Sequence, residues 1–394
     1  MTVKQIYALL NKVAEEVYGK RDVDLVNTAD FYSLGETVLT NDTEKYLNTL
    51  VDRIGRIVIR TLDVATDFPA ILRDSFTFGA ILSKVNIQPL EAQAQKAWNV
   101  GDNNFVADQF KIDKPNISAK YWKGAAAFEF DLTIPDTMFR SAFTSETEMS
   151  NFISGVMKSL ETSMTLYLNN LTHGVVAGAI AEKLKTTHYV NLLSMYNTAH
   201  STSLTAPQAL ETAAFLKYAG RIIGNYLAYL EVPSVLYNEG NLVRATTRDN
   251  LHCWLATAFT SAYRVYLESD TFNKELVSLP GFYEYKYIQG TGNSYAINDE
   301  KNTSVLVNTA DGSTVGAAYI IGVLADRQAI ATGLTDRFTA ADRNNRQRYT
   351  NYTNGATLQH VIDLSENMVV FTLGGATVIP PETQNNTRKA SSKS

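Results

Sequence analysis

The chain has 394 residues, of which 45% are hydrophobic and 19% are charged, and its formal net charge is −5. The apolar content excludes an intrinsically disordered protein, and the length suits two or three folding units or one large one. A mildly acidic chain without a long basic run is not typical of a dedicated nucleic-acid reader. The charged fraction lies below the roughly 25% of an average soluble domain, which indicates that much of the surface meets other protein.

The cysteine content and the length of the apolar runs indicate where in the cell the protein is made and used. Cys253 is the only cysteine, which excludes an intrachain disulfide framework and a cysteine-rich zinc site. The longest apolar stretches are about half of the ~18 residues that indicate a membrane span. Lys4, Lys12 and Glu15 interrupt the apolar core that a secretory signal needs. We therefore expect no membrane span and a protein that is made and used in a cytoplasm.

The N-terminal part shows helical periodicity in two places. Apolar residues recur at helical spacing over residues 3–18 and again over 44–64, which predicts two amphipathic helices. The segment between them reads as loose, and Pro69 ends the second helix. The first 70 residues therefore read as an extended arm.

Residues 83–134 change to the pattern of β-structure. Phe128 and Ile134 belong to an alternating run over 126–134 that is typical of a strand with one buried face. The segment 101–104 has the composition of a turn at the tip of an excursion. We expect an extended β excursion that ends in this strand.

The strongest local signal is a capping box at Ser145 and Glu148. It opens a proline-free run with apolar residues at helical spacing as far as residue 185, which predicts one helix about 60 Å long. Such a rod needs support from more than a small globular core.

The remaining elements are shorter. Pro207 suits the first turn of a helix that reaches residue 230, and another helix is predicted over 250–267. Strands are predicted over 233–237, 282–289 and 317–325, with a loop or hairpin over 290–313 and two short strands within 360–373. Residues 377–394 are polar and read as a flexible tail.

Catalytic and metal-binding patterns are absent. The sequence has no phosphate loop, no zinc-binding His-Glu-x-x-His and no nucleophile elbow. Gly290 and Gly292 begin a dinucleotide-type loop that lacks its third glycine, and Cys253 reads as a small buried thiol. Asp311 could touch a cation, but turn chemistry explains it as well. We expect no catalytic, cofactor-binding or metal-binding residues and no cofactor.

One cluster is rich in arginine. Its members Arg337, Arg343, Arg346 and Arg348 alternate with acidic and tyrosine residues. A nucleic-acid patch would explain the positive charge, but the alternating signs favour an ion-paired contact between subunits.

Five stretches carry a resemblance to a known family: residues 132–164 (LTIPDTMFRSAFTSETEMSNFISGVMKSLETSM), 269–290 (SDTFNKELVSLPGFYEYKYIQG), 323–332 (VLADRQAIAT), 344–355 (NNRQRYTNYTNG) and 366–371 (ENMVVF). With the order of the predicted elements, this text resembles the major capsid proteins of tailed bacteriophages, and most of all those of small short-tailed phages (podoviruses) of Gram-positive hosts.

The resemblance implies an α+β chain with the Hong Kong 97 fold. By it, residues 1–82 are the N-terminal arm, 83–135 the E-loop and strand, 136–200 the P-domain with the spine helix, 201–335 the A-domain, 336–376 a return through the P-domain and 377–394 a flexible tail. The E-loop reaches over a neighbouring subunit in this family. The expected inter-subunit contacts are therefore Trp98, Asp102, Phe110, Lys114, Arg337, Arg343, Arg346 and Arg348.

The implied function is structural. Pentamers and hexamers of the chain would form an icosahedral head that is assembled in the host cytoplasm and encloses double-stranded DNA without reading its sequence. Scaffolding, portal and decoration proteins are possible partners, and no membrane is involved. Two alternatives stay open: a cargo-enclosing nanocompartment shell of the same fold, and a soluble oligomeric enzyme with an unrecognised site.

Overall fold

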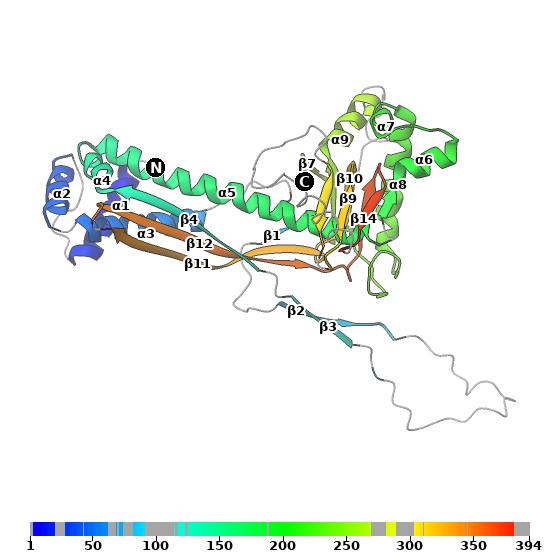
Figure 1. Cartoon of the computed structure of the whole chain (residues 1–394), viewed down its shortest axis with the longest axis horizontal. Coiled ribbons are helices and arrows are strands. Elements are labelled where there is room, and N and C mark those ends of the chain that lie inside the picture. Colours follow the sequence, from blue (N-terminus) through cyan, green and yellow to red (C-terminus); the bar gives the residue numbers. More distant parts are fainter. Residues whose placement is uncertain are drawn as a thin grey trace, which may run out of the picture.

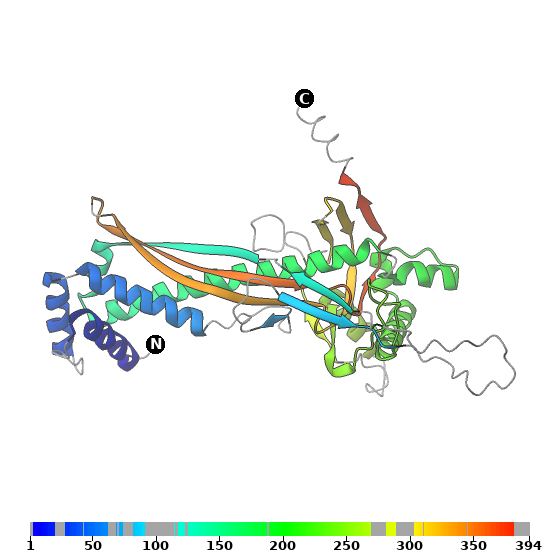
Figure 2. The same cartoon turned by 90° about the horizontal axis from the view of Figure 1, so that it is seen from below.

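The computed structural model is elongated, with a cluster of helices at one end and a larger α/β lobe at the other (Figures 1 and 2). A thin two-stranded ribbon projects from the lobe (Figure 1). The structure describes residues 3–19, 28–41, 43–61, 68, 71–73, 82–90, 114, 117–122, 125–186, 189–268, 281–288, 303–309, 311–344 and 346–381. No helix in these ranges combines the length and the apolar character that a membrane crossing requires.

The long helix α5 (Glu146–Leu184) connects the two ends. Its start is the predicted cap, because the Ser145 side chain accepts a hydrogen bond from the Glu148 backbone N–H at 3.2 Å. Beside it runs a sheet with the strand order β1 (Leu72–Arg73), β11 (Ile330–Asn344), β12 (Tyr349–Ile362) and β4 (Ala125–Pro135). The predicted alternation in β4 is confirmed, since Phe128 and Ile134 are buried and the residues between them alternate.

The N-terminal helices form a packed cluster around the first half of α5. They are α1 (Val3–Tyr18), α2 (Thr28–Asn41) and α3 (Thr43–Thr61), and α4 (Asp136–Ala142) joins them. Tyr46 is fully buried there, and its hydroxyl donates to the Leu10 carbonyl at 3.1 Å. The expectation of a loose segment between two helices was wrong, because α2 lies within it. Gly35 weakens the helical signal of α2 and at the same time lets the Phe143 ring approach.

The lobe at the other end is built on a sheet with the order β5 (Tyr189–Asn191), β13 (Met368–Thr372), β10 (Ile320–Asp326), β6 (Leu251–Ala256) and β7 (Tyr283–Tyr285). Every residue of β10 is buried, which confirms the strand predicted over 317–325. The helices α6 (Leu192–His200), α7 (Ala206–Leu210), α8 (Ala213–Glu231) and α9 (Thr257–Tyr263) surround this sheet. A small sheet of β14 (Ala376–Ile379), β9 (Thr314–Ala317) and β8 (Val305–Asn308) stands beside it.

Several predictions for the lobe need correction. The helix expected over 250–267 begins as the interior strand β6, because its residues pair with β10 on one side and β7 on the other. The helix expected over 207–230 is two helices, since the amides of Glu211 and Thr212 bond to carbonyls three residues back and end α7. Residues 233–237 form only a bridge between Ser234 and Arg244. The strand β14 occupies 376–379, where a flexible tail was expected.

Two apolar cores support the two ends of α5. One core joins the N-terminal helices to its first half, including Ile153 and Leu160, and the other joins the lobe to its last turns, including Ile180. A smaller cluster lies between them, where Leu168 of α5 packs on Phe128 and Leu358 of the sheet. Because each half of the helix is buried in a different core, α5 fixes the spacing between them.

Candidate functional site at the base of a projecting ribbon

A highly exposed element is the antiparallel pair of β2 (Leu82–Ile87) and β3 (Ile117–Trp122), which we call the ribbon. It stands away from the body in the view of Figure 1. Its outer face is apolar: Val85 is 61% exposed, and Ile87 and its cross-strand partner Ile117 are 62% and 56% exposed. Two strands alone do not bury enough surface to be stable in water, so this face is built to be covered.

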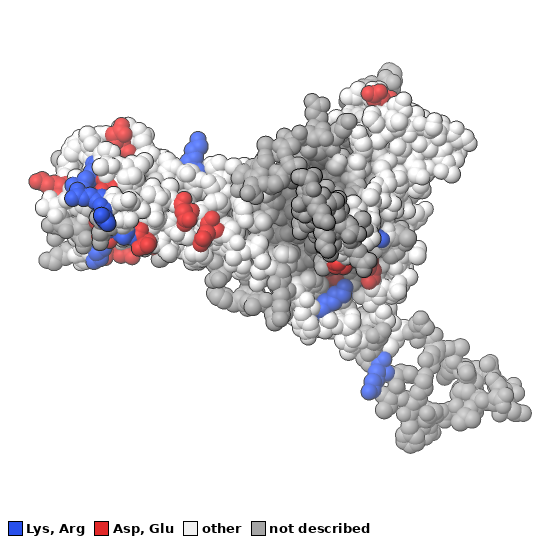
Figure 3. Space-filling model, viewed as in Figure 1, with Lys and Arg blue, Asp and Glu red and all other residues white. Residues whose placement is uncertain are grey.

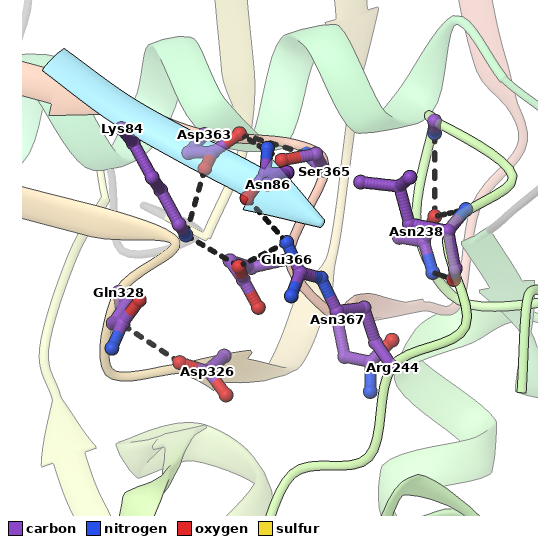
Figure 4. A network of polar contacts seen from close by, with 12 residues as sticks. Lys84, Asn86, Asn238, Arg244, Asp326, Gln328, Asp363, Ser365, Glu366 and Asn367 are labelled. Carbon is purple, nitrogen blue, oxygen red and sulfur yellow. Dashed lines mark hydrogen bonds and ion pairs between the residues drawn. The ribbon is translucent and has the colours of Figure 1, made fainter. Parts of the chain in front are cut away.

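The inner face of the ribbon carries polar residues that reach the body. Side chains alternate between the faces of a strand, so Lys84 and Asn86 point opposite to Val85 and Ile87. Lys84 Nζ lies 3.0 Å from Asp363 Oδ2 and also contacts Glu366, and Lys120 Nζ lies 3.2 Å from Asp363 Oδ1. Figure 4 shows Lys84 and Asn86 directed from β2 into this network.

The receiving side is the turn between β12 and β13. The Asp363 side chain is fully buried and accepts from the Ser365 backbone N–H at 3.0 Å and from the Ser365 hydroxyl. Burial acts to raise the pKa of Asp363, but the Ser365 hydrogen bond and the Lys84 ammonium outweigh it, so the pKa lies below the usual aspartate range. Asp363 is therefore a carboxylate at neutral pH.

A loop after α8 supplies the third cation. Arg244 donates to Asn86 Oδ1 at 2.5 Å and pairs with Glu366 at 3.2 Å (Figure 4). We call Lys84, Asn86, Lys120, Arg244, Asp363 and Glu366 the anchor cluster.

The loop that carries Arg244 is itself held in place. Asn238 is fully buried and donates from Nδ2 to the Leu242 carbonyl at 2.7 Å. From α5, Lys183 donates to the Tyr237 carbonyl at 3.1 Å. Burial lowers the pKa of Lys183 to about 8, although the Glu239 carboxylate acts in the opposite direction. The spine helix therefore positions the loop, and the loop positions Arg244.

A cavity of about 780 Å³ opens beside the anchor cluster. Its lining includes Lys84, Trp122, Arg327, Asp363 and Glu366. The Trp122 ring is fixed above it by a hydrogen bond from Nε1 to the Ile362 carbonyl at 3.1 Å. The cavity thus brings solvent next to the anchor cluster, at Glu366, whose side chain is 8% exposed, while the Asp363 side chain stays buried.

The structure separates the residues that the sequence proposed as inter-subunit contacts. Trp98, Asp102 and Phe110 lie outside the described residues, Lys114 is exposed, and only the backbone of Arg337 is described, within β11.

The other three arginines lie at the tip of the β11–β12 hairpin. Arg343 pairs within its own chain, at 2.9 Å from Asp136 and 3.3 Å from Glu44, whereas Arg346 and Arg348 are exposed. Charged side chains of both signs gather at this end of the molecule, while the upper part of the lobe shows a nearly uncharged face (Figure 3).

One chemical prediction can be compared with the structure. Cys253 is buried, as predicted, and burial raises the pKa of its thiol to about 12, so a nucleophilic thiolate is disfavoured. Within the described ranges, no three His, Cys, Asp or Glu side chains are placed to hold a metal ion.

Reasoning from the sequence did not find the anchor cluster. Lys84 and Asp363 are 279 positions apart, and no local pattern links them. The only signal was Asp363-Leu364-Ser365, which is typical of a turn in which the Asp side chain caps the backbone.

Comparisons with known proteins support a single assignment. The family model of Phi29-like phage major capsid proteins matches residues 8–372, whereas a search of curated proteins found no match. Among solved structures, a chain in the structure of the head fiber and inner core protein gp22 of native bacteriophage P68 is 10% identical, with a TM-score of 0.51 over 79% of this chain and 85% of that one. A chain of the Staphylococcus phage Andhra capsid is 8% identical, with a TM-score of 0.49 over 80% of this chain and 86% of that one.

The P68 likeness shows a shared fold, and the family match covers most of the chain. The mixture of strands and helices around the long helix α5 agrees with both. The chain therefore belongs to the Phi29-like phage major capsid proteins, with a Hong Kong 97-like fold and a structural rather than enzymatic role in the capsid of the virion.

Proposed function

We propose that this protein assembles through pentamers and hexamers into an icosahedral head that encloses double-stranded DNA, and that it does so in the cytoplasm of a bacterial host. The observation that carries the proposal is the ribbon, whose outer apolar face has no cover within the described part of its own chain. In a shell of identical chains, the natural cover is a second copy. Residues 83–135 would then act as the E-loop and the lobe as the A-domain.

The net charge of −5 supports a container that does not grip nucleic acid. Scaffolding, portal and decoration proteins would complete such a head. A nanocompartment shell of the same fold is the remaining alternative, and the nucleic acid content of the particles separates the two.

The first test is negative-stain electron microscopy of the purified protein, with its mass in solution and a nucleic-acid assay, alone and with co-expressed phage proteins. Closed icosahedral particles that hold DNA when packaging proteins are present would support the proposal. A small oligomer of fixed size under every condition would contradict it and favour the enzyme alternative.

The second test changes the outer face of the ribbon. Val85→Ser with Ile87→Ser should leave the fold intact and lower the yield of shells, because burial of one such side chain contributes about 1.5–3 kcal/mol. Val85→Ile with Ile87→Val keeps the face apolar and is the matched control. Normal shell yield from the serine variant, measured by sedimentation, would show that this face is not a subunit contact.

A further inference from the structure

The ribbon is attached to the body by polar contacts. Its described partners in the body are Asp363, Glu366, Arg244 and the Ile362 carbonyl, through the contacts given above. No described residue of the ribbon belongs to any of the three apolar clusters. The direction of the ribbon therefore depends on ion pairs and hydrogen bonds, whereas the rest of the molecule depends on apolar burial.

Two carboxylates make most of the contacts that attach the ribbon to the body, and we call this attachment the joint. Asp363 pairs with Lys84 and Lys120, and Glu366 pairs with Lys84 and Arg244. The Asp363 side chain is completely buried and that of Glu366 is 8% exposed, whereas the side chains of Lys84, Lys120 and Arg244 are 22%, 41% and 23% exposed. Loss of either carboxylate charge therefore removes the partner of cations that can turn toward solvent. The other charged groups around the joint are Lys183 and Glu239 on the side of α5, and Asp326 and Arg327 across the cavity.

The joint also has room to rearrange. A cavity of about 780 Å³ lies beside it, outside both cores, and leaves space into which its side chains can move. Asn86 is 3% exposed, yet its Nδ2 has no hydrogen-bond partner among the described residues, and the same holds for Arg244 Nε. An unmet buried donor costs free energy, so this network holds the ribbon less tightly than a fully satisfied one would.

From these observations we infer that the anchor cluster is an electrostatic latch: it fixes the direction of the ribbon, and neutralising Asp363 and Glu366 releases the ribbon while the body stays folded. The inference rests on the proposed function only in that the ribbon is the part that lies on a neighbouring copy. The latch would then decide whether a subunit presents its ribbon in the direction that the shell requires.

The sign of the pH dependence follows from Asp363. Its pKa is lowered in the folded chain, so its ion pairs with Lys84 and Lys120 are complete at neutral pH and are lost as the pH falls through that lowered pKa. Acid below that pKa should therefore act on these two pairs as Asp363→Asn does.

The test measures the direction of the ribbon in the full, unassembled chain. Spin labels are placed at Ser118→Cys on β3 and Ala214→Cys on α8, both exposed, while the buried Cys253 stays unlabelled. Pulsed electron spin resonance then gives the distance distribution between the labels. A second pair of labels, at Asn151→Cys on α5 and Ala214→Cys on α8, reports on the body alone.

At neutral pH the chain with the unaltered anchor cluster should give one narrow peak in the distance distribution between the two labels. Asp363→Asn with Glu366→Gln should abolish that peak and leave the body pair unchanged. If that variant fails to fold, Lys84→Gln with Lys120→Gln removes the three ion pairs of the ribbon with Asp363 and Glu366, and Lys84→Arg with Lys120→Arg should restore the peak.

A matched control removes charge elsewhere. Lys185→Gln breaks ion pairs with Glu182 and Asp311 of similar length, 3.0 and 2.9 Å, and should leave the ribbon peak narrow. A narrow peak that persists in the Lys84→Gln, Lys120→Gln variant would overturn the latch. Electron microscopy of the unlabelled protein separates this failure from failure of the proposed function, because closed shells with a persistent peak would refute only the latch.

Discussion

At the scale of single residues, two glycines illustrate opposite demands of the fold. Gly155 lies inside α5, and a Cβ there would have no atom within 4 Å. At Gly355 on β12, a Cβ would lie 2.5 Å from the Phe338 ring and 2.9 Å from the Phe128 carbonyl oxygen. Only the second glycine is required by packing.

We predict that Gly155→Ala raises the free energy of unfolding by about 0.5–1 kcal/mol, because alanine favours the helix and lowers the entropy of the unfolded chain. Gly355→Ala should lower it by about 1–3 kcal/mol, because the backbone oxygen cannot move aside as a side chain can. Urea unfolding of the unassembled chain measures both values. Equal effects of the two substitutions would contradict this account of Gly355.

Lys183 is a buried cation on the last turns of α5, and its pKa is lowered to about 8 by burial. Its folded pKa lies below its unfolded value near 10.4, so the unfolded chain binds more protons between these two values, and stability rises with pH across that window. Relative to Lys183→Met, the wild-type chain should gain about 2 kcal/mol between neutral pH and about pH 10.

Thermal unfolding of both chains across this pH range checks the Lys183 prediction. The comparison with Lys183→Met cancels the contributions of buried tyrosines, which titrate at higher pH. If the unfolding temperatures of the two chains change with pH in parallel, Lys183 keeps its charge through contacts other than Glu239.

At the scale of elements, the sequence predicts best where the signal is local. Ser145 caps α5 as its spacing from Glu148 predicts, and the buried alternation of β4 is visible from Phe128 to Ile134. The strand β6 lies where the sequence predicts a helix. A short apolar run is compatible with either, and only pairing with β10 makes it a strand.

Pairing between segments far apart in the chain explains why the sequence does not predict two other features. The hairpin of β11 and β12 was not predicted, because its strands carry charges and small residues and are fixed by β4 and α5, which are far away in the chain. The anchor cluster is harder still, since its cations and carboxylates come from segments that meet only in the folded molecule.

The spine helix carries a direct prediction. Val156 is 5% exposed and belongs to the N-terminal core, so Val156→Pro should break α5 there at a cost of about 3 kcal/mol or more and abolish shell assembly. Glu161→Ala, at an exposed position on the same helix, is the control and should assemble normally. Intact shells from the proline variant, seen by electron microscopy, would show that assembly does not need a continuous spine.

At the scale of the whole molecule, one helix is buried in two separate cores. Met149, Ile153 and Leu160 of α5 pack with the N-terminal helices, whereas Val176 and Ile180 pack with the lobe. Contacts within one core do not depend on the other. The two halves of α5 should therefore differ in the free energy of local unfolding.

Removal of residues 1–19 tests this division, because it deletes α1 and uncovers the partners of Leu10 while leaving the lobe untouched. Amide hydrogen exchange should then rise over the first half of α5, about residues 146–164, and stay unchanged over 176–184. Hydrogen–deuterium exchange followed by mass spectrometry resolves the two segments within one helix. Faster exchange along the whole of α5 would mean that the molecule opens as one cooperative unit, and the spine would then transmit a change at the N-terminal helices to the lobe that carries the anchor cluster.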